Sequence, residues 1–156
     1  MRLQFAITAA VLFAASATSV LAADFPSRRA GLWDVTVKME GMDLPSRTNK
    51  MCLDAATDAK LMKLGVATKE AKCDEMKVSG AGNVRIVDSM CHMNGGEQKS
   101  HIVMTYAGNS AYHMEVRSQF SPPIMGHNQS HIMQDAKWVG PCPADMKPVD
   151  MMINGM

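Results

Sequence analysis

Methionine and histidine are the side chains of this sequence whose spacing could support metal chemistry. The chain has 16 Met and 5 His residues, and one short segment brings together Met125, His127, His131 and Met133. Thioether and imidazole groups together suit Cu(I), so copper is the cofactor that this segment would bind. Methionine is also an adaptable core residue, and the segment is expected to be a loop that enters a strand rather than a helix. We therefore expect no cofactor, with copper binding as the alternative.

Four aromatic side chains are candidate walls of an apolar ligand pocket: Trp33, Tyr106, Tyr112 and Phe120. A curled β-sheet with a covering helix can enclose such a pocket, as small barrels do. The competing interpretation is that these residues fill the core, because the chain contains few aromatic residues. The partner would be an apolar small molecule, or another envelope protein that binds at a sheet edge.

Motifs of the common enzyme classes are absent from the sequence. It contains no Gly-x-Ser-x-Gly elbow, no His-Glu-x-x-His segment and no phosphate-binding loop. The Gly-Ala-Gly segment at residues 80–82 lacks the third glycine and the following helix of a dinucleotide-binding loop. We therefore expect a protein that is not an enzyme and has no catalytic residues.

The stretch from Cys73 to Cys91 predicts a β-hairpin. Its strand-like runs flank residues 80–83, Gly-Ala-Gly-Asn, which tolerate the positive φ of a tight reversal. With the reversal centred on this segment, Val78 faces Ile86, and the two cysteines face each other. Facing residues of an antiparallel pair have Cβ atoms about 4.5 to 5.5 Å apart, close to disulfide reach. The pattern therefore predicts a Cys73–Cys91 disulfide.

The first 22 residues have the layout of a secretory signal peptide. Arg2 precedes an apolar run that is shorter than the about 20 residues needed to span a bilayer, and small residues follow it. We expect a signal peptide at 1–22, a single β-rich domain at 23–143 and a loosely held C-terminal tail at 144–156. The mature protein would be periplasmic or secreted, with no membrane span after signal removal.

Charge gives no reason to expect nucleic acid as a partner. Loss of Arg2 from the 16 Lys and Arg residues leaves 15 cations, equal to the 15 Asp and Glu residues. A neutral chain without a basic run lacks the electrostatic footprint of nucleic-acid binding.

Alternation of apolar and polar residues predicts the first strands. Residues 31–39 place Trp33 and Val35 on one face and polar residues on the other, and residues 46–53 can return as a second strand. Asp54 then has the type of a helix N-cap, and Gly65 the type of a C-terminal stop. These residues predict one short helix that covers the sheet.

A second hairpin is predicted from residues 101–106 and 111–120. Ile102 and Met104 alternate in phase with Met114 and Val116, which leaves residues such as His113 outward. The two prolines at 122–123 should end the strand, because proline cannot donate to a ladder. With a last strand at about 130–139, the sequence predicts a mainly β fold: an antiparallel meander or partly closed barrel of about seven strands with one short helix, stabilised by disulfides.

Four cysteines in an exported chain predict two disulfides. If Cys73 bonds to Cys91, Cys52 is left to join Cys142, which closes a loop of roughly 90 residues and stabilises by about 4 to 5 kcal/mol in the chain-entropy model. The alternative, Cys52 with Cys73 and Cys91 with Cys142, remains open.

The order of several segments resembles a known family. The chain opens with RAGLWDVTVKMEG, continues with MCLD and two central cysteines, and closes with WVGPC. In this combination it resembles the bacterial family labelled domain of unknown function 3617, over about residues 26–142, through Gly31, Trp33, Val35, the four cysteines and Gly140. The resemblance implies a soluble envelope protein and carries no activity, ligand or catalytic residue.

These observations predict an exported, periplasmic protein. Its role would be that of a non-enzymatic binding or structural module of the envelope that holds an apolar ligand or a protein partner. Periplasmic copper binding through Met and His is the alternative function.

Overall fold

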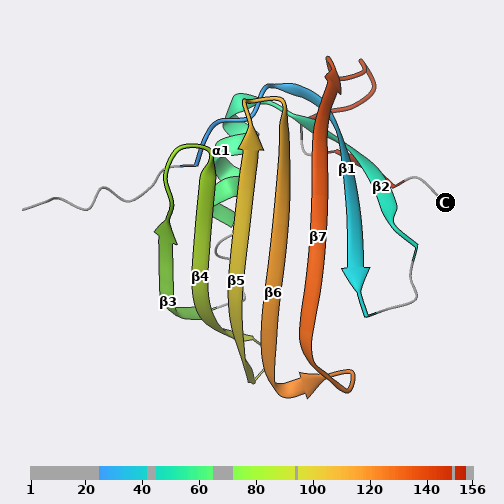
Figure 1. Ribbon diagram of the computed structural model, residues 1–156. Coiled ribbons are helices and arrows are strands. Elements are labelled where there is room, and N and C mark those ends of the chain that lie inside the picture. Colours follow the sequence, from blue (N-terminus) through green and yellow to red (C-terminus); the bar gives the residue numbers. More distant parts are fainter. Residues whose placement is uncertain (1–24, 42–44, 65–71, 94, 149, 154–156) are drawn as a thin grey trace, which may run out of the picture.

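The computed structural model describes residues 25–41, 45–64, 72–93, 95–148 and 150–153. In these residues the chain forms eight strands and one helix: β1 (Gly31–Glu40), β2 (Arg47–Leu53), α1 (Ala55–Leu64), β3 (Lys72–Ser79), β4 (Val84–Met93), β5 (Gly96–Ala107), β6 (Ala111–Ile124), β7 (His127–Gly140) and β8 (Met151–Ile153). The strands form one sheet in the order β3-β4-β5-β6-β7-β1-β2-β8 (Figure 1). The predicted signal peptide at 1–22 lies outside the described residues.

The predicted antiparallel meander with one short helix and two disulfides is confirmed. Strands β3 to β7 follow one another in the sheet, and the β1–β2 hairpin is added beside β7. The chain therefore crosses from one side of the sheet to the other between β2 and β3, and α1 lies in this crossover. Among the described residues the sheet stays open, with β3 and β8 at its edges, and β8 is the strand beyond the seven expected.

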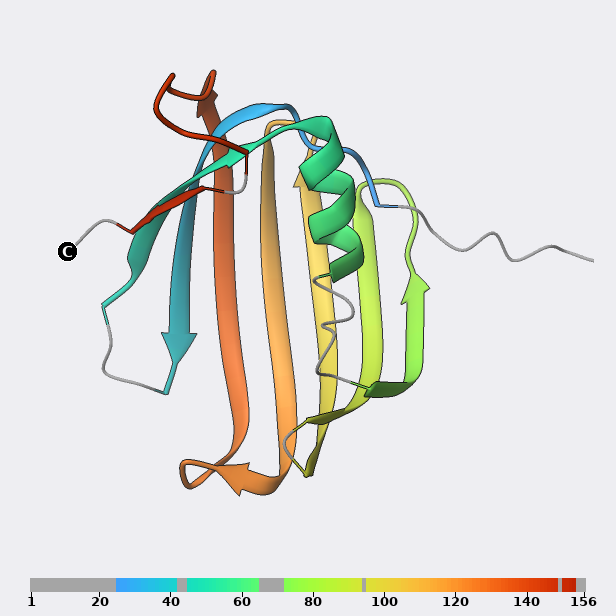
Figure 2. The ribbon, with the colours of Figure 1, turned by 180° about the vertical axis from the view of Figure 1, so that it is seen from behind.

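Helix α1 lies against one face of the curved sheet, as the front and back views show (Figures 1 and 2). We call this the inner face, and the opposite face the outer face. Period-2 alternation along the strands sends their apolar side chains to the inner face. Leu61 of α1 packs there against the buried core, which consists of Trp33, Val35, Leu53, Met104, Tyr106, Tyr112 and Ala136.

The first turn of α1 is capped as the sequence predicts. The Thr57 N–H donates to Asp54 Oδ1 at 2.7 Å, and the Asp54 N–H donates to Thr57 Oγ1 at 3.0 Å. These two bonds satisfy amide groups that have no partner within the helix. The predicted stop at Gly65 lies outside the described residues.

A buried ion pair joins α1 to the segment before β1. Arg28 Nε donates to Asp58 Oδ1 at 2.5 Å, and the Arg28 backbone N–H donates to Asp58 Oδ2 at 2.9 Å. The two side chains are only 5% and 6% exposed. Arg28 also donates from Nη1 to the Tyr112 hydroxyl at 3.3 Å, so one side chain connects the N-terminal segment, the helix and strand β6.

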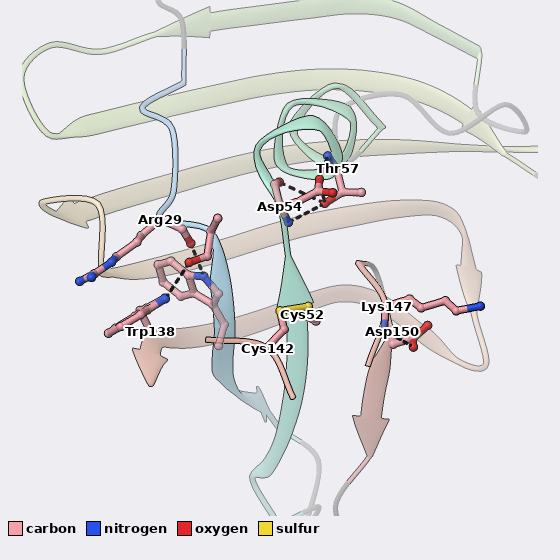
Figure 3. Close-up of a disulfide and its surroundings, with 10 residues drawn as sticks. Arg29, Cys52, Asp54, Thr57, Trp138, Cys142, Lys147 and Asp150 are labelled. Carbon is pink, nitrogen blue, oxygen red and sulfur yellow. Dashed lines mark hydrogen bonds between the residues drawn. A yellow bond between two sulfur atoms is a disulfide. The ribbon is translucent and has the colours of Figure 1, made fainter. Parts of the chain in front are cut away.

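Two tryptophans hold the start of β1 in place. Trp33 Nε1 donates to the Arg29 carbonyl at 2.9 Å, and Trp138 Nε1 donates to the Ala30 carbonyl at 3.0 Å (Figure 3). The Arg29 guanidinium lies over the Trp138 ring, 3.8 Å from its centroid, as in a cation–π contact. Gly31 has a φ of 133°, and a Cβ there would collide with the Trp138 indole nitrogen. This explains why glycine stands between alanine and leucine in the opening motif.

The disulfides join Cys73 to Cys91 and Cys52 to Cys142. This is the pairing that the hairpin register favoured, and the alternative pairing is not the one present. The second bond fastens the end of β2 to the segment after β7 (Figure 3).

The register predicted for the central hairpin was wrong by one residue. Val78 pairs with Val87 rather than Ile86. The two cysteines still face each other, because β3 has an irregularity between Cys73 and Glu75 that inserts one extra residue. The bulge therefore compensates for the shifted turn.

The prediction that the prolines at 122–123 end their strand was also wrong, because β6 continues to Ile124. Its pairing with β5 extends to Ser121, and its pairing with β7 is interrupted between Gln119 and Ile124. The prolines lie within this interruption, so their missing N–H groups leave no ladder bond unmade.

Part of the C-terminal segment 144–156, expected to be loosely held, contacts the domain. Strand β8 pairs with β2, from Asn49 to Met51, and Met146 is 8% exposed. How firmly this segment is held stays a prediction.

Asp58→Asn should lower the free energy of unfolding by about 3 to 5 kcal/mol, because it leaves the Arg28 guanidinium buried without a counter-charge. Asp135→Asn is the matched control: this carboxylate pairs with His113 but is 73% exposed, so its loss should cost less than about 1 kcal/mol. Urea denaturation of both variants measures the difference. Equal, small losses would contradict the role assigned to the buried pair.

Candidate functional site

Three of the four aromatic residues predicted as pocket walls lie together in the core. Trp33, Tyr106 and Tyr112 are 1%, 3% and 5% exposed. The Tyr112 ring centroid lies 6.0 Å from that of Trp33 and 6.1 Å from that of Tyr106, which are distances of packed aromatic rings. Phe120 is half-buried and lines a separate small groove of about 360 Å³. Binding of an apolar ligand by these residues stays a prediction.

The polar ends of the two tyrosines have partners inside the protein. Besides the bond from Arg28, the Tyr112 hydroxyl accepts from Gln134 Nε2 at 2.6 Å, and the Tyr106 hydroxyl donates to Met104 Sδ at 3.7 Å. Burial raises the pKa of Tyr106 from 10.0 to about 12, because its phenolate would lose the solvation of water. These contacts are typical of a closed, satisfied core.

Four histidines of the outer face are each hydrogen-bonded to a carboxylate. The contacts are His92–Asp74 at 2.8 Å, His101–Asp88 at 2.6 Å, His113–Asp135 at 2.7 Å and His131–Glu40 at 2.6 Å. The last three join residues directly opposite on neighbouring strands. The sequence predicted that His113 points outward. It gave no sign of the partners of the four histidines, because these depend on the strand register.

His131 lies between two carboxylates. Its Nδ1 is 2.6 Å from Glu40 Oε2, and its Nε2 is 2.6 Å from Glu115 Oε1. Glu115 also contacts the Arg117 guanidinium, so the arrangement connects β1, β7 and β6.

His131, Glu40 and Arg117 belong to a row of residues that crosses six strands of the outer face. Each member of the row lies directly opposite the next. We call it the cross-strand row: Lys77 of β3, Asp88 of β4, His101 of β5, Arg117 of β6, His131 of β7 and Glu40 of β1. At about 4.8 Å between neighbouring strands, the row is roughly 24 Å long. No sequence motif marks it, since its members are far apart in the chain.

A groove of about 1170 Å³ follows the cross-strand row, and all six members line it. A second series of opposed residues lines it as well, one from each of β3 to β7: Glu75, Met90, Lys99, Gln119 and Gln129. We call this space the main groove. Most of its lining residues are polar or charged, whereas the pocket predicted from the sequence had aromatic walls.

The residues predicted as copper ligands are only partly brought together. His127 and His131 line the main groove. Met125 is 94% exposed at the turn between β6 and β7, and Met133 is half-buried on β7 outside the groove lining. Within the described residues, no group of three or more His, Cys, Asp and Glu side chains could hold a metal ion.

Comparison with known proteins gives one match. The model of a family described as "Protein of unknown function (DUF3617)" matches residues 28–142. Neither the curated proteins nor the solved structures give a match. The matched segment begins at the buried Arg28 and ends at the disulfide-bonded Cys142, so it contains the seven long strands and both disulfides. In the described part of the chain, no helix has the length and apolar character needed to cross a membrane.

Tyr106 should ionise near pH 12 in the native protein, which ultraviolet absorbance of tyrosinate can measure, and Tyr106→Phe should remove this transition. Because the pKa in the folded state is raised above 10.0, the stability that burial of the neutral phenol contributes is present below pH 10. It is lost as the pH rises from 10 to 12. Ionisation near pH 10 with the fold intact would instead show that water reaches Tyr106, as it would in an open ligand pocket.

Proposed function

The chain belongs to the DUF3617 family of proteins of unknown function, which supplies no activity, and from the structure we propose an exported, non-enzymatic binding protein of the bacterial envelope whose ligand lies in the main groove. The groove itself is the observation that carries this proposal. Its volume of about 1170 Å³ is slightly above the roughly 300 to 1,000 Å³ of ordinary small-molecule sites. It therefore suits a polar ligand of that size or somewhat larger.

Export is supported by the signal-like first 22 residues together with the two disulfides. Disulfides persist in oxidising compartments such as the periplasm and are rare in the cytosol. A periplasmic location accounts for both features, and a secreted protein would share them.

The surroundings of His101 favour binding over nucleophilic catalysis. The His101 Nδ1 is hydrogen-bonded to Asp88, as the histidine of a catalytic dyad is to its carboxylate. Nucleophilic catalysis would also require a nucleophile close to His101. In the described strands, the outer-face positions next to His101 on β4, β5 and β6 contain no Ser, Thr or Cys. Four serines also line the groove, but strand alternation turns their side chains to the inner face: Ser89, Ser100, Ser118 and Ser130. The Ser100 hydroxyl there is 3.0 Å from that of Ser118.

Native mass spectrometry of the mature protein, purified from an oxidising compartment and compared with the denatured sample, should reveal a bound polar ligand and the loss of residues 1–22. Gln119→Trp should remove the excess mass, because the indole fills the groove at an exposed position. Lys137→Trp is the matched control: Lys137 lies on the outer face of β7 but outside the groove lining, so this variant should retain the excess mass. A ligand-free wild-type protein, even after incubation with a periplasmic extract, would contradict the proposal.

Copper binding through Met and His is a second candidate, because His127 and His131 both line the main groove, as does the Met90 thioether. Imidazole and thioether are the ligand types that Cu(I) accepts. The Glu40 and Glu115 contacts of His131 would have to break for that ring to bind the metal.

His127→Ala combined with His131→Ala should abolish copper binding without changing the fold, if copper is the ligand. Inductively coupled plasma mass spectrometry measures the metal, and circular dichroism checks the fold. His113→Ala, on the same face but outside the groove, is the control and should bind copper as the wild type does. Unchanged copper content in the double variant would exclude this groove as the site.

A further inference from the structure

We propose that the main groove recognises an oxyanion, a carboxylate or phosphate group of its ligand, at its centre over strands β5, β6 and β7. This inference rests on the proposed binding function and specifies the chemistry of the ligand. It comes from the distribution of charge along the groove rather than from the net charge of the chain.

The centre of the groove is basic. Among the described lining residues, the titratable side chains from β5, β6 and β7 are Lys99, His101, Arg117, His127 and His131, and none is a carboxylate. The lining carboxylates lie toward its ends: Glu75 and Asp88 on β3 and β4, and Glu40 on β1. Lys77 on β3 is the lining cation at these ends, where it lies among the carboxylates. A negatively charged group is therefore attracted more strongly to the centre of the groove than to its ends.

Two of the end carboxylates already have partners within the groove. Asp88 binds His101 and Glu40 binds His131, each at 2.6 Å. Both carboxylates therefore pair with imidazole rings rather than with Lys99 or Arg117, and they hold the two rings in fixed orientations.

Arg117 and Lys99 are the donors best placed to bind the oxyanion. Their side chains are 63% and 61% exposed. Glu115 contacts one terminal nitrogen of Arg117, which leaves further donors of the planar guanidinium, a group whose geometry matches carboxylate and phosphate. Among the described residues, Lys99 forms an ion pair with Glu97 at 3.4 Å, and such exposed surface pairs contribute little.

The strand register lets these two cations act on one group. Arg117 lies opposite His101, and Lys99 lies opposite Gln119, so Lys99 and Arg117 are diagonal neighbours on adjacent strands. Diagonal neighbours are about 7 to 8 Å apart at the backbone, within reach for two long side chains. Gln119 adds an uncharged amide donor beside them.

The test is a titration of the ¹⁵N-labelled mature protein with inorganic phosphate and, separately, with citrate, at ionic strength kept constant with sodium chloride. Saturable shift changes should concentrate at residues 99–101 and 117–119. Arg117→Gln and Lys99→Gln should each weaken binding by roughly tenfold or more, since each removes a charge-assisted hydrogen bond. Lys137→Gln removes the same charge from the same face outside the groove and should leave binding unchanged.

Saturable binding of phosphate alone or of citrate alone supports the inference and identifies the oxyanion. Absence of saturable binding, or equal weakening by Lys137→Gln and Arg117→Gln, overturns it. If the inference fails while a ligand sensitive to Gln119→Trp remains in the native mass spectrum, the binding function stands with a different ligand chemistry. If the anions bind but no natural ligand is ever retained, the oxyanion site stands and the proposed function fails.

Discussion

The arrangement of this domain depends on the ion pair between Arg28 and Asp58. Helix α1 has only ten residues, and an isolated helix of that length is marginal in water. It is held in place because Asp58 accepts from both the side chain and the backbone of Arg28, and because Arg28 reaches Tyr112 on the sheet. Two charges that are so nearly buried are tolerable only when each satisfies the other. The pair therefore specifies one position of the helix over the inner face.

Once the helix covers the inner face, the two faces of the sheet have different chemistry. The inner face is filled by packed aromatic and aliphatic side chains, with Trp33, Tyr106 and Tyr112 in contact through their rings. The outer face has no covering helix in the described structure, and its side chains form pairs across neighbouring strands. The outer face is consequently the one that presents polar side chains to solvent, while the inner face stabilises the fold.

The sequence was sufficient to predict features set by local chemistry. Alternation around Trp33 and Val35 identified β1, Asp54 identified the start of α1, and the facing positions of Cys73 and Cys91 identified a disulfide-closed hairpin. The prediction from sequence was wrong where strand pairing, rather than a local residue type, determined the structure. The two cases are the bulge before Glu75 and the continuation of β6 past its prolines. Arg28 and Asp58 carried no signal, because 30 residues separate them and each is an ordinary charged residue in isolation.

The candidate site likewise depends on strand pairing between residues that are distant in the sequence, which local sequence patterns do not predict. A net charge of zero for residues 23–156 argues against long-range attraction of a polyanion, and this remains valid for the chain as a whole. It does not describe the groove, because the sheet places strands of unlike composition side by side. Lys99 and Arg117 are 18 residues apart, yet the β5–β6 pairing makes them neighbours, while the same sheet moves Glu75 and Glu40 to opposite ends. The cross-strand row is about 24 Å long, which is roughly three Debye lengths at physiological salt, so charges at its two ends are largely screened from each other. Strand pairing in a chain of zero net charge thus produces a basic centre of the main groove, which the amino-acid composition does not indicate.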